Sequence, residues 1–187
     1  MKIVNHEISH PFFTRFQSGM AAVCVRTGSI PHLVTTSHRV YAFILRDAEA
    51  EGMDVLLSAE RFQGVPLVKF PGGGKSPGES DEQCLVRELF EELQLVNVRV
   101  GALIHQSKAP VQSQFDPNVW VSTSYYLIAS FSEPQHHLVP RLTVPEKDGE
   151  RVTWCALMAL DASALSLSSD RDALHALKSV MASATSP

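Results

Sequence analysis

A glycine-rich turn that runs directly into an acidic helix constrains this chain more than any other feature. The stretch reads FPGGGKSPGESDEQCLVRELFEELQL and covers residues 70–95. Its three consecutive glycines allow unusual dihedral angles and let bare backbone approach another group closely, whereas a regular strand there would carry a conformational cost. A Pro-Gly turn follows at 77–78. We therefore expect a short extended segment at 67–70, a turn and then a helix.

The start and the end of this helix can be predicted from its capping residues. Ser80 is a good N-cap, and Gln83 three residues later completes a capping box. Asp81 and Glu82 suit the positive end of the helix dipole. The helix is therefore predicted from Ser80 or Asp81 to about Leu93.

Three carboxylates gather on one face of this predicted helix. At about 100° per residue, Glu88, Glu91 and Glu92 fall within one turn of each other. Like charges at this spacing repel, so a turn followed by an ordinary solvated helix explains the cluster poorly. A hard divalent cation such as Mg2+ would offset the repulsion, and Arg87 can hold a carboxylate by a forked hydrogen bond. Packing on a sheet is expected for the apolar flank, which consists of Leu85, Val86, Leu89 and Leu93.

The same stretch resembles the Nudix box. That pattern is G, five residues, E, seven residues, R-E-aliphatic, one residue, E-E, one residue, G-aliphatic. Gly73, Glu79 and RELFEELQL at 87–95 match every fixed position except one, where Gln94 replaces the last glycine. The family's glycine ends the helix in a left-handed conformation, which costs a glutamine about 1 kcal/mol.

The resemblance implies a fold and an activity. The expected fold is α+β, an α/β/α sandwich with a mixed β-sheet, formed by a single domain over 1–187 with 1–17 and 182–187 peripheral. The expected activity is hydrolysis of the pyrophosphate linkage in a nucleoside diphosphate linked to another moiety, with Mg2+ or Mn2+. A nucleotide-binding sensor without turnover is the alternative, although such proteins tend to lose box glutamates that this chain keeps.

The resemblance also assigns roles to individual residues. Metal-ligand roles fall to the Gly72 carbonyl and the carboxylates of Glu79, Glu88, Glu91 and Glu92. Among these, Glu92 is a principal ligand and Glu88 can serve as ligand or as base. Arg87 matches the orienting arginine. We count Glu88, Glu92 and Arg87 as catalytic.

A further acidic residue from a distant loop assists catalysis in many Nudix enzymes. The candidates are Glu146, Asp148 and Glu150, in the segment VPEKDGE, and we place Glu146 first. Plain solvated loop charges are the alternative for all three. Arg61 and Lys69 are interpreted as surface cations, with phosphate contact as the alternative.

Aromatic residues near this loop and the preceding one have two interpretations. Trp154 is expected in the core rather than as a platform for a nucleobase. Phe115 and Trp120 could stack on a base or pack as a lid.

Composition limits the kinds of molecule that this chain is expected to bind. A net charge of −4 and a pI near 6.0 argue against binding a nucleic-acid polymer. No stretch is apolar enough for a membrane span, and the three cysteines form no CxxC pair, which favours reduced thiols in the cytoplasm. Few cations line the expected pocket, so a nucleotide substrate with two or three phosphates is favoured, a nucleoside triphosphate or a nucleotide sugar such as ADP-ribose. A homodimer is left open.

Hydrophobic patterning predicts the remaining elements. Residues 39–59 are interpreted as one hairpin, and 28–37, 107–118 and 132–150 as loops. Strands are expected at 20–26, 39–46, 54–59, 96–106, 119–131 and 151–160, with a last helix from Ser169 to about Met181.

Overall fold

The computed structural model describes residues 21–24, 33–48, 52–132, 138–147 and 149–184. The expected peripheral segment 1–17, the candidate Asp148 and residues 185–187 lie outside these ranges. Within them, no helix is long and apolar enough to cross a membrane.

The larger of two sheets is mixed. Its central pair, β2 and β9, runs parallel, and every other neighbouring pair in it is antiparallel. The order is β1-β2-β9-β7, with β6 paired to β2 and β8 to β9. The strands are β1 (Ala21–Cys24), β2 (Leu33–Phe43), β6 (Gly72–Gly74), β7 (Arg99–Gln106), β8 (Val111–Gln112) and β9 (Val119–Ser130).

The smaller sheet is antiparallel and continues from the first. Its order is β10-β4-β3, with β5 paired to β4. A single residue, Ile44, separates β2 from β3, and its carbonyl accepts a hydrogen bond of 3.0 Å from Leu56. The strands are β3 (Leu45–Asp47), β4 (Met53–Phe62), β5 (Val65–Lys69) and β10 (Glu150–Ala156).

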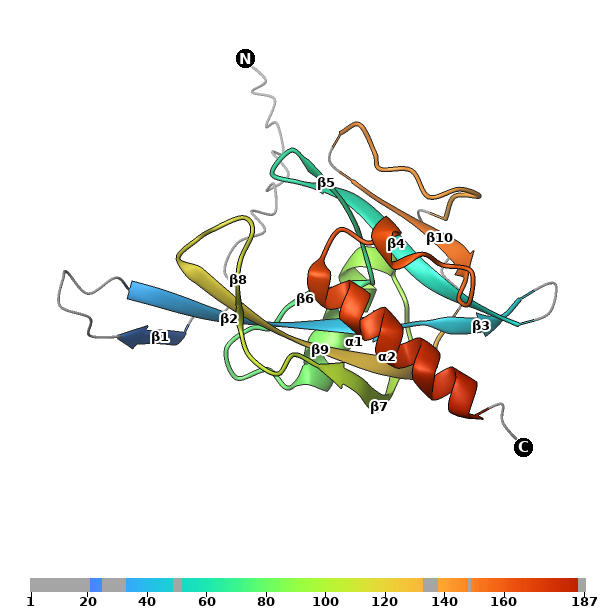
Figure 1. The fold of residues 1–187 in the computed structure, drawn as a ribbon, viewed down its shortest axis with the longest axis horizontal. Helices are drawn as coiled ribbons and strands as arrows, with labels where there is room; N and C mark the ends of the chain where they lie inside the picture. Colours follow the sequence, from blue (N-terminus) through green and yellow to red (C-terminus); the bar gives the residue numbers. More distant parts are fainter. Residues whose placement is uncertain (1–20, 25–32, 49–51, 133–137, 148, 185–187) are drawn as a thin grey trace, which may run out of the picture.

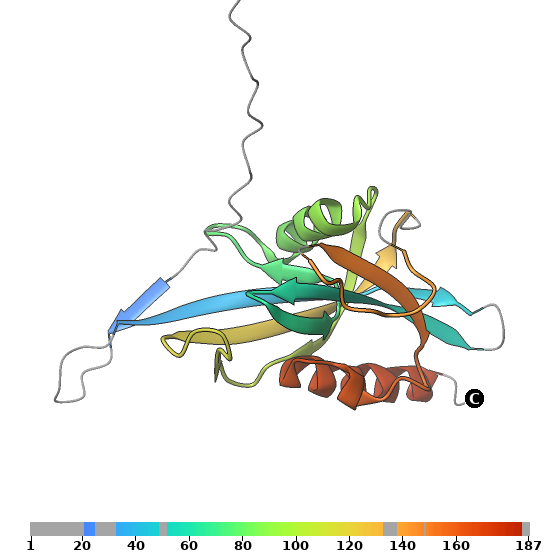
Figure 2. The same cartoon turned by 90° about the horizontal axis from the view of Figure 1, so that it is seen from above.

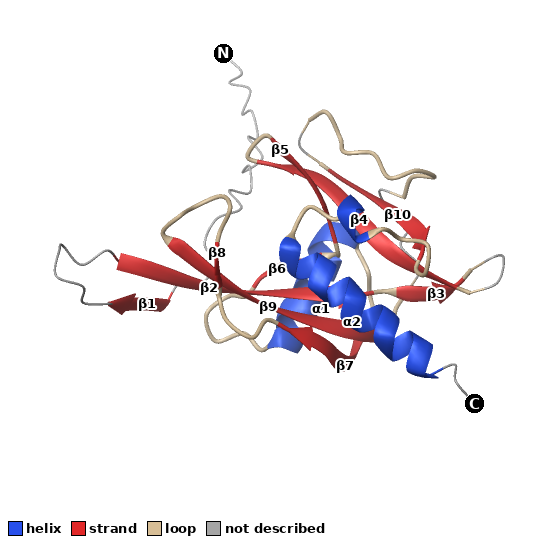
Figure 3. Ribbon diagram, viewed as in Figure 1, coloured by secondary structure: helices blue, strands red, loops and turns tan. Residues whose placement is uncertain are grey.

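Two helices cover opposite sides of the strands, α1 (Asp81–Leu93) and α2 (Ser168–Ala184). Figures 1 and 2 show the green α1 and the red α2 separated by the sheet layer, and Figure 3 shows the strands between the two helices. The predicted α/β/α sandwich with a mixed sheet is confirmed.

Strand alternation divides the core between the two helices. Val40, Ala42 and Ile44 of the β2 region pack in the cluster that contains the apolar face of α1. Tyr41 and Phe43, the residues between them, pack in the cluster that contains α2. Because side chains alternate across a strand, one strand supplies both cores. Burying each large apolar side chain contributes about 1.5–3 kcal/mol.

The capping predictions for α1 are confirmed. Ser80 accepts a hydrogen bond from the Gln83 N–H, and the Gln83 side chain accepts one from the Ser80 N–H. At the other end, Gln94 adopts the left-handed conformation with φ 54° and ψ 29°, and its N–H donates to the Phe90 carbonyl at 2.9 Å. The glutamine therefore takes the backbone conformation that the family's glycine supplies.

Several expected elements differ from the structure. The 39–59 hairpin is wrong in its first half, because β2 joins the larger sheet and only β3 and β4 form a hairpin. The loop predicted at 28–37 gives way to strand from Leu33, since Thr35 to Phe43 pair in parallel with β9. Residues 111–112 of the 107–118 loop form β8, and the strand predicted to residue 160 ends at Ala156. The first two differences depend on the pairing of β2 with the distant β9.

The described cysteines behave as expected. Cys84 is buried and Cys155 half-buried, and both are free. Burial raises the pKa of the Cys84 thiol to about 12, with the nearby glutamates adding to the effect. A thiol with so high a pKa is a poor nucleophile.

Candidate active site

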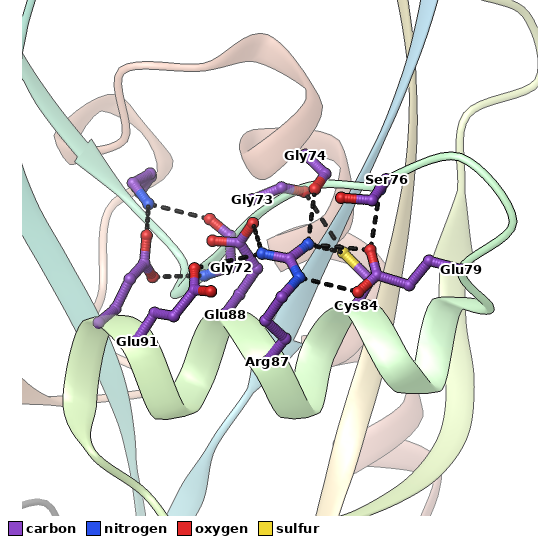
Figure 4. A network of polar contacts seen from close by, with 11 residues as sticks. Gly72, Gly73, Gly74, Ser76, Glu79, Cys84, Arg87, Glu88 and Glu91 are labelled. Atoms are coloured by element: carbon purple, nitrogen blue, oxygen red, sulfur yellow. Dashed lines mark hydrogen bonds and ion pairs between the residues drawn. The ribbon is translucent and has the colours of Figure 1, made fainter. Parts of the chain in front are cut away.

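Arg87 is the centre of a polar network on the side of α1 that faces the short strand β6. Its Nε and Nη2 donate to the two carboxylate oxygens of Glu79 at 2.8 and 2.9 Å. Its Nη1 donates to Glu88 at 2.8 Å and to Glu91 at 3.2 Å, and Nη2 also donates to the Gly74 carbonyl at 3.0 Å. Figure 4 shows the guanidinium between these groups. The arginine thus fixes three of the five predicted ligand residues.

Glu79 is held as a carboxylate by this network. Its Oε2 also accepts a hydrogen bond of 2.8 Å from the Ser76 N–H. The forked hydrogen bond from Arg87, with the Ser76 N–H adding to it, lowers the pKa of Glu79 below its ordinary value. A forked pair of this kind fixes direction as well as charge.

The glycines are required by close approach of the backbone. Gly72 has φ 129°, and a Cβ there would lie 2.3 Å from the Val40 carbonyl oxygen. A Cβ at Gly73 would lie 2.5 Å from the carboxylate carbon of Glu88. Contrary to the expected cost of a strand, Gly72–Gly74 form the short β6 beside β2, because only glycine leaves room for this pairing and for Glu88.

Glu92 lies beneath the first of these glycines. Its Oε2 accepts a hydrogen bond of 3.0 Å from the Gly72 N–H, and its Oε1 accepts one of 3.3 Å from the Lys69 ammonium. Glu92 and Glu88 are each only 6% exposed. Two of the predicted ligands are therefore buried carboxylates that contact the glycine strand, β6 (Gly72–Gly74).

Lys69 is the main feature of the site that sequence reasoning misread. It is 4% exposed, so the interpretation as a surface cation is wrong. Its ammonium donates to the Gly72 carbonyl at 3.0 Å and lies 3.5 Å from Glu60. Burial by itself would lower the pKa of Lys69, but the carboxylates of Glu92, Glu60 and Glu150 raise it above the ordinary value. Period-two alternation with buried Leu67 along β5 was the signal that could have found it.

Of the two acidic loop candidates that the structure describes, Glu150 is the one that lies with Glu92. Glu150 begins β10, opposite Glu60 of β4, and the Ser58 hydroxyl donates a hydrogen bond to it. Burial, with the charge of Glu92 adding to it, raises the pKa of Glu150 to about 8. Glu146, the first choice from sequence, is exposed, and its catalytic role stays a prediction.

A cavity of about 190 Å3 lies beside Lys69, which contacts Glu92. Glu60 and Lys69 line it together with Arg39, and Phe62 and Phe115 form one of its apolar walls. The two phenylalanine rings meet edge to face at 4.9 Å. The site therefore opens into a space with an aromatic wall and a cationic side chain.

The other two aromatic candidates lie elsewhere. Trp154 is partly buried and packs against the α1 core, with the Arg46 guanidinium 4.3 Å from its ring centroid. Its expected place in the core is confirmed. Trp120 is 40% exposed on β9.

The donor atoms suit a hard divalent cation. Carboxylate and backbone carbonyl oxygens are the ligands that Mg2+ and Mn2+ prefer. Among the described residues, no three His, Cys, Asp or Glu side chains converge on one point as a metal site requires. The cationic groups of Arg87 and Lys69 contact these oxygens instead. The residues therefore fit the metal in chemical type.

Comparison with known proteins agrees with this geometry. A family model for the NUDIX domain matches residues 36–177. A search of curated proteins found no match. Among solved structures, the E. coli ORF135 protein is similar at 22% identity over 82% of this chain and 96% of its own, with a TM-score of 0.58. The MutT Nudix hydrolase of Burkholderia pseudomallei is 24% identical, over 76% of this chain and 98% of its own, with a TM-score of 0.56.

A Caenorhabditis elegans Ap4A hydrolase is also similar, at 16% identity over 78% of this chain and 98% of its own, with a TM-score of 0.53. At these identities the solved structures establish the fold alone, while the family model spans most of the chain. The chain therefore belongs to the Nudix hydrolase family, whose members act on pyrophosphate bonds of nucleoside diphosphate derivatives.

Proposed function

We propose that this protein hydrolyses the pyrophosphate linkage of a nucleoside diphosphate derivative in a reaction that depends on Mg2+ or Mn2+. The observation that carries the proposal is the arrangement of Glu88 and Glu92, buried beneath the glycine strand and tied to Arg87 and Gly72. The metal would be held by the Gly72 carbonyl and by the carboxylates of Glu79, Glu88, Glu91 and Glu92. When bound, it supplies charge neutralisation on the phosphate oxygens and a more acidic water.

The chain's own residues would orient these groups and handle the proton. Arg87 holds Glu79, Glu88 and Glu91 in fixed directions, so little reorganisation is needed on binding. Burial and the charge of Glu92 raise the pKa of Glu150, which favours its protonated form. Glu150 can give this proton to a departing phosphate oxygen or, once ionised, accept one from the attacking water. Glu146 is the alternative for this role.

The cavity favours a substrate of modest charge. Its lining includes the aromatic pair, suited to one face of a base, while its cations Arg39 and Lys69 stand beside the acidic Glu60. Long polyphosphates would require more Lys and Arg than this. A nucleoside triphosphate, including oxidised forms, or a nucleotide sugar such as ADP-ribose fits better than the substrate in the name of the C. elegans Ap4A hydrolase.

A nucleotide-binding sensor without turnover is the second candidate. Its defining sign would be missing box glutamates, whereas this chain keeps all of them, hydrogen-bonded to Arg87 or to Gly72. Catalysis is therefore preferred. The reducing, cytoplasmic environment remains a prediction, and so does the homodimer.

A substrate screen tests the proposal. Purified protein is incubated with nucleoside triphosphates, their 8-oxo forms, ADP-ribose and diadenosine tetraphosphate, with Mg2+, Mn2+ or EDTA. Products are separated by ion-exchange chromatography. Pyrophosphate and a monophosphate from a triphosphate, or AMP and ribose 5-phosphate from ADP-ribose, are the expected products, and EDTA should abolish both. Turnover in EDTA would contradict the proposal, and nucleotide binding without turnover would favour the sensor.

A further inference from the structure

Lys69 contacts two groups that the proposed function gives to the metal. Its Nζ lies 3.0 Å from the Gly72 carbonyl oxygen and 3.3 Å from Glu92 Oε1. The Glu60 carboxylate lies 3.5 Å from the same nitrogen. A single buried ammonium therefore contacts a carbonyl and two carboxylates, which is the donor set expected around a hard cation.

The fold leaves this ammonium little freedom. Lys69 ends β5 and pairs with Ser58 of β4, whose hydroxyl binds Glu150 on the other neighbouring strand. The next residue, Phe70, is fully buried in the α2 core. Since consecutive side chains leave a strand on opposite sides, anchoring Phe70 directs Lys69 to the α1 side.

We propose that Lys69 is a resident cation that competes with the divalent metal for the Gly72 carbonyl and Glu92. The inference rests on the proposed metal-dependent function. In the metal-free protein the ammonium offsets the buried acidic charge. A divalent cation that takes the same oxygens must displace the ammonium, because two cations cannot share one set of donors at contact distance without strong repulsion. Lys69 thereby lowers metal affinity and stabilises the metal-free enzyme.

Two competing accounts predict something different. If Lys69 only contacted substrate phosphate, its removal would weaken substrate binding and leave metal affinity unchanged. If it only packed the core, its removal would lower stability equally with and without metal.

Metal affinity in Lys69→Met separates these accounts. The variant keeps the unbranched stem and loses the charge. Mn2+ binding to chelator-stripped protein, without nucleotide, is measured by electron paramagnetic resonance of free Mn2+. We expect Lys69→Met to bind Mn2+ about tenfold more tightly than wild type or better. Its melting temperature should fall below that of wild type in EDTA, and saturating Mn2+ should narrow the gap.

Lys75→Met is the matched control. Lys75 forms an ion pair of 2.7 Å with Asp81 at the start of α1, so its removal deletes the same charge near the box. If only the loss of a positive charge mattered, Mn2+ affinity would rise similarly in both variants. Competition for shared donors predicts a clearly larger rise in Mn2+ affinity in Lys69→Met.

A measurement on wild type keeps the test independent of how the variants fold. The ammonium of Lys69 is followed by 15N-detected lysine NMR and identified by its absence in Lys69→Gln. We expect its resonance to shift or broaden as Mg2+ saturates the protein.

The outcomes distinguish this inference from the proposed function. The competition would be overturned if Lys69→Met bound Mn2+ no more tightly than wild type. It would also be overturned if the Lys69 resonance did not move when Mg2+ saturates the protein. Failure of both wild type and Lys69→Met to bind Mn2+ would overturn the metal-dependent function and the competition together.

Discussion

The two helix faces of the sheet each bury acidic side chains, but they compensate them differently. On the α1 face, Glu88 and Glu92 are matched by the cations of Arg87 and Lys69. On the α2 face, fully buried Asp170 accepts a hydrogen bond of 2.6 Å from the neutral Tyr125 hydroxyl. The first arrangement pairs buried carboxylates with cations, and the second pairs a buried carboxyl with a neutral hydroxyl.

The difference separates a binding site from a structural contact. Burial raises the pKa of Asp170 to about 7, against the opposing effect of the Tyr125 hydrogen bond. A buried carboxyl with a raised pKa binds a proton more readily and is a weaker ligand for a metal. A carboxylate that is matched by a cation can exchange this cation for another. We therefore place function on the α1 face and stability on the α2 face.

The largest effect is expected from Glu92→Gln, which keeps the side chain's size and removes the charge. Turnover should fall on the order of 10²-fold or more, because a metal ligand is lost. The free energy of unfolding should fall by about 3 kcal/mol, since the Gly72 N–H can still donate to the amide oxygen while Lys69 loses a buried charged partner. Steady-state kinetics and urea titration measure the two effects.

Glu82→Gln serves as its control, because Glu82 is exposed in the first turn of the same helix. It should retain wild-type turnover. Full activity in Glu92→Gln would contradict the assignment of the α1 face.

The next effect is a pH dependence of the free energy of unfolding, caused by Asp170 on the α2 face. Asp170 ionises near its ordinary pKa in the unfolded chain and near pH 7 in the folded protein. Between about pH 4 and 7 the unfolded state therefore binds fewer protons, so stability falls as pH rises through this window, by about 4 kcal/mol. In Asp170→Asn this contribution is absent.

The melting temperature, measured at several pH values between 4 and 7, should thus decline less steeply with pH for Asp170→Asn than for wild type. Glu150, whose pKa is also raised, contributes a decline to both proteins. Equal slopes for the two proteins would show that Asp170 is ionised when buried and would remove the contrast between the faces.

Arg87→Lys should have a moderate effect. A lysine cannot reproduce the forked contact with Glu79 while also reaching Glu88. We expect about tenfold slower turnover, with metal affinity reduced to a similar extent. Arg99→Lys, on an exposed residue of β7, is the control and should match wild type. An unchanged rate in Arg87→Lys would mean that the network does not orient the ligands.

The smallest effect should come from Gln94→Gly at the end of α1. Gln94 holds φ 54°, so glycine should stabilise the protein by about 1 kcal/mol and raise the melting temperature by a few degrees. Turnover should not change. A lower melting temperature would show that the glutamine side chain makes a compensating contact.

The sequence predicted what depends on local rules. Ser80 and Gln83 set the start of α1, and the spacing of Glu88, Glu91 and Glu92 identified the acidic face. Lys69 and Glu150 were harder to assign, because their places depend on how β4 pairs with β5 and β10. Alternation along β5 places Lys69 on the face of Leu67, but the sequence does not show which strands lie beside it. The same limit is why β2 was predicted too short.

The most direct test of the contrast is Mn2+ binding to wild type, Glu92→Gln and Asp170→Asn, stripped of metal and measured by electron paramagnetic resonance. Both mutations remove one buried carboxyl, and they differ in the face on which it lies. We predict that Asp170→Asn binds Mn2+ as wild type does, and that Glu92→Gln binds it at least about tenfold more weakly. Wild-type affinity in Glu92→Gln, or an equal loss in Asp170→Asn, would contradict the account.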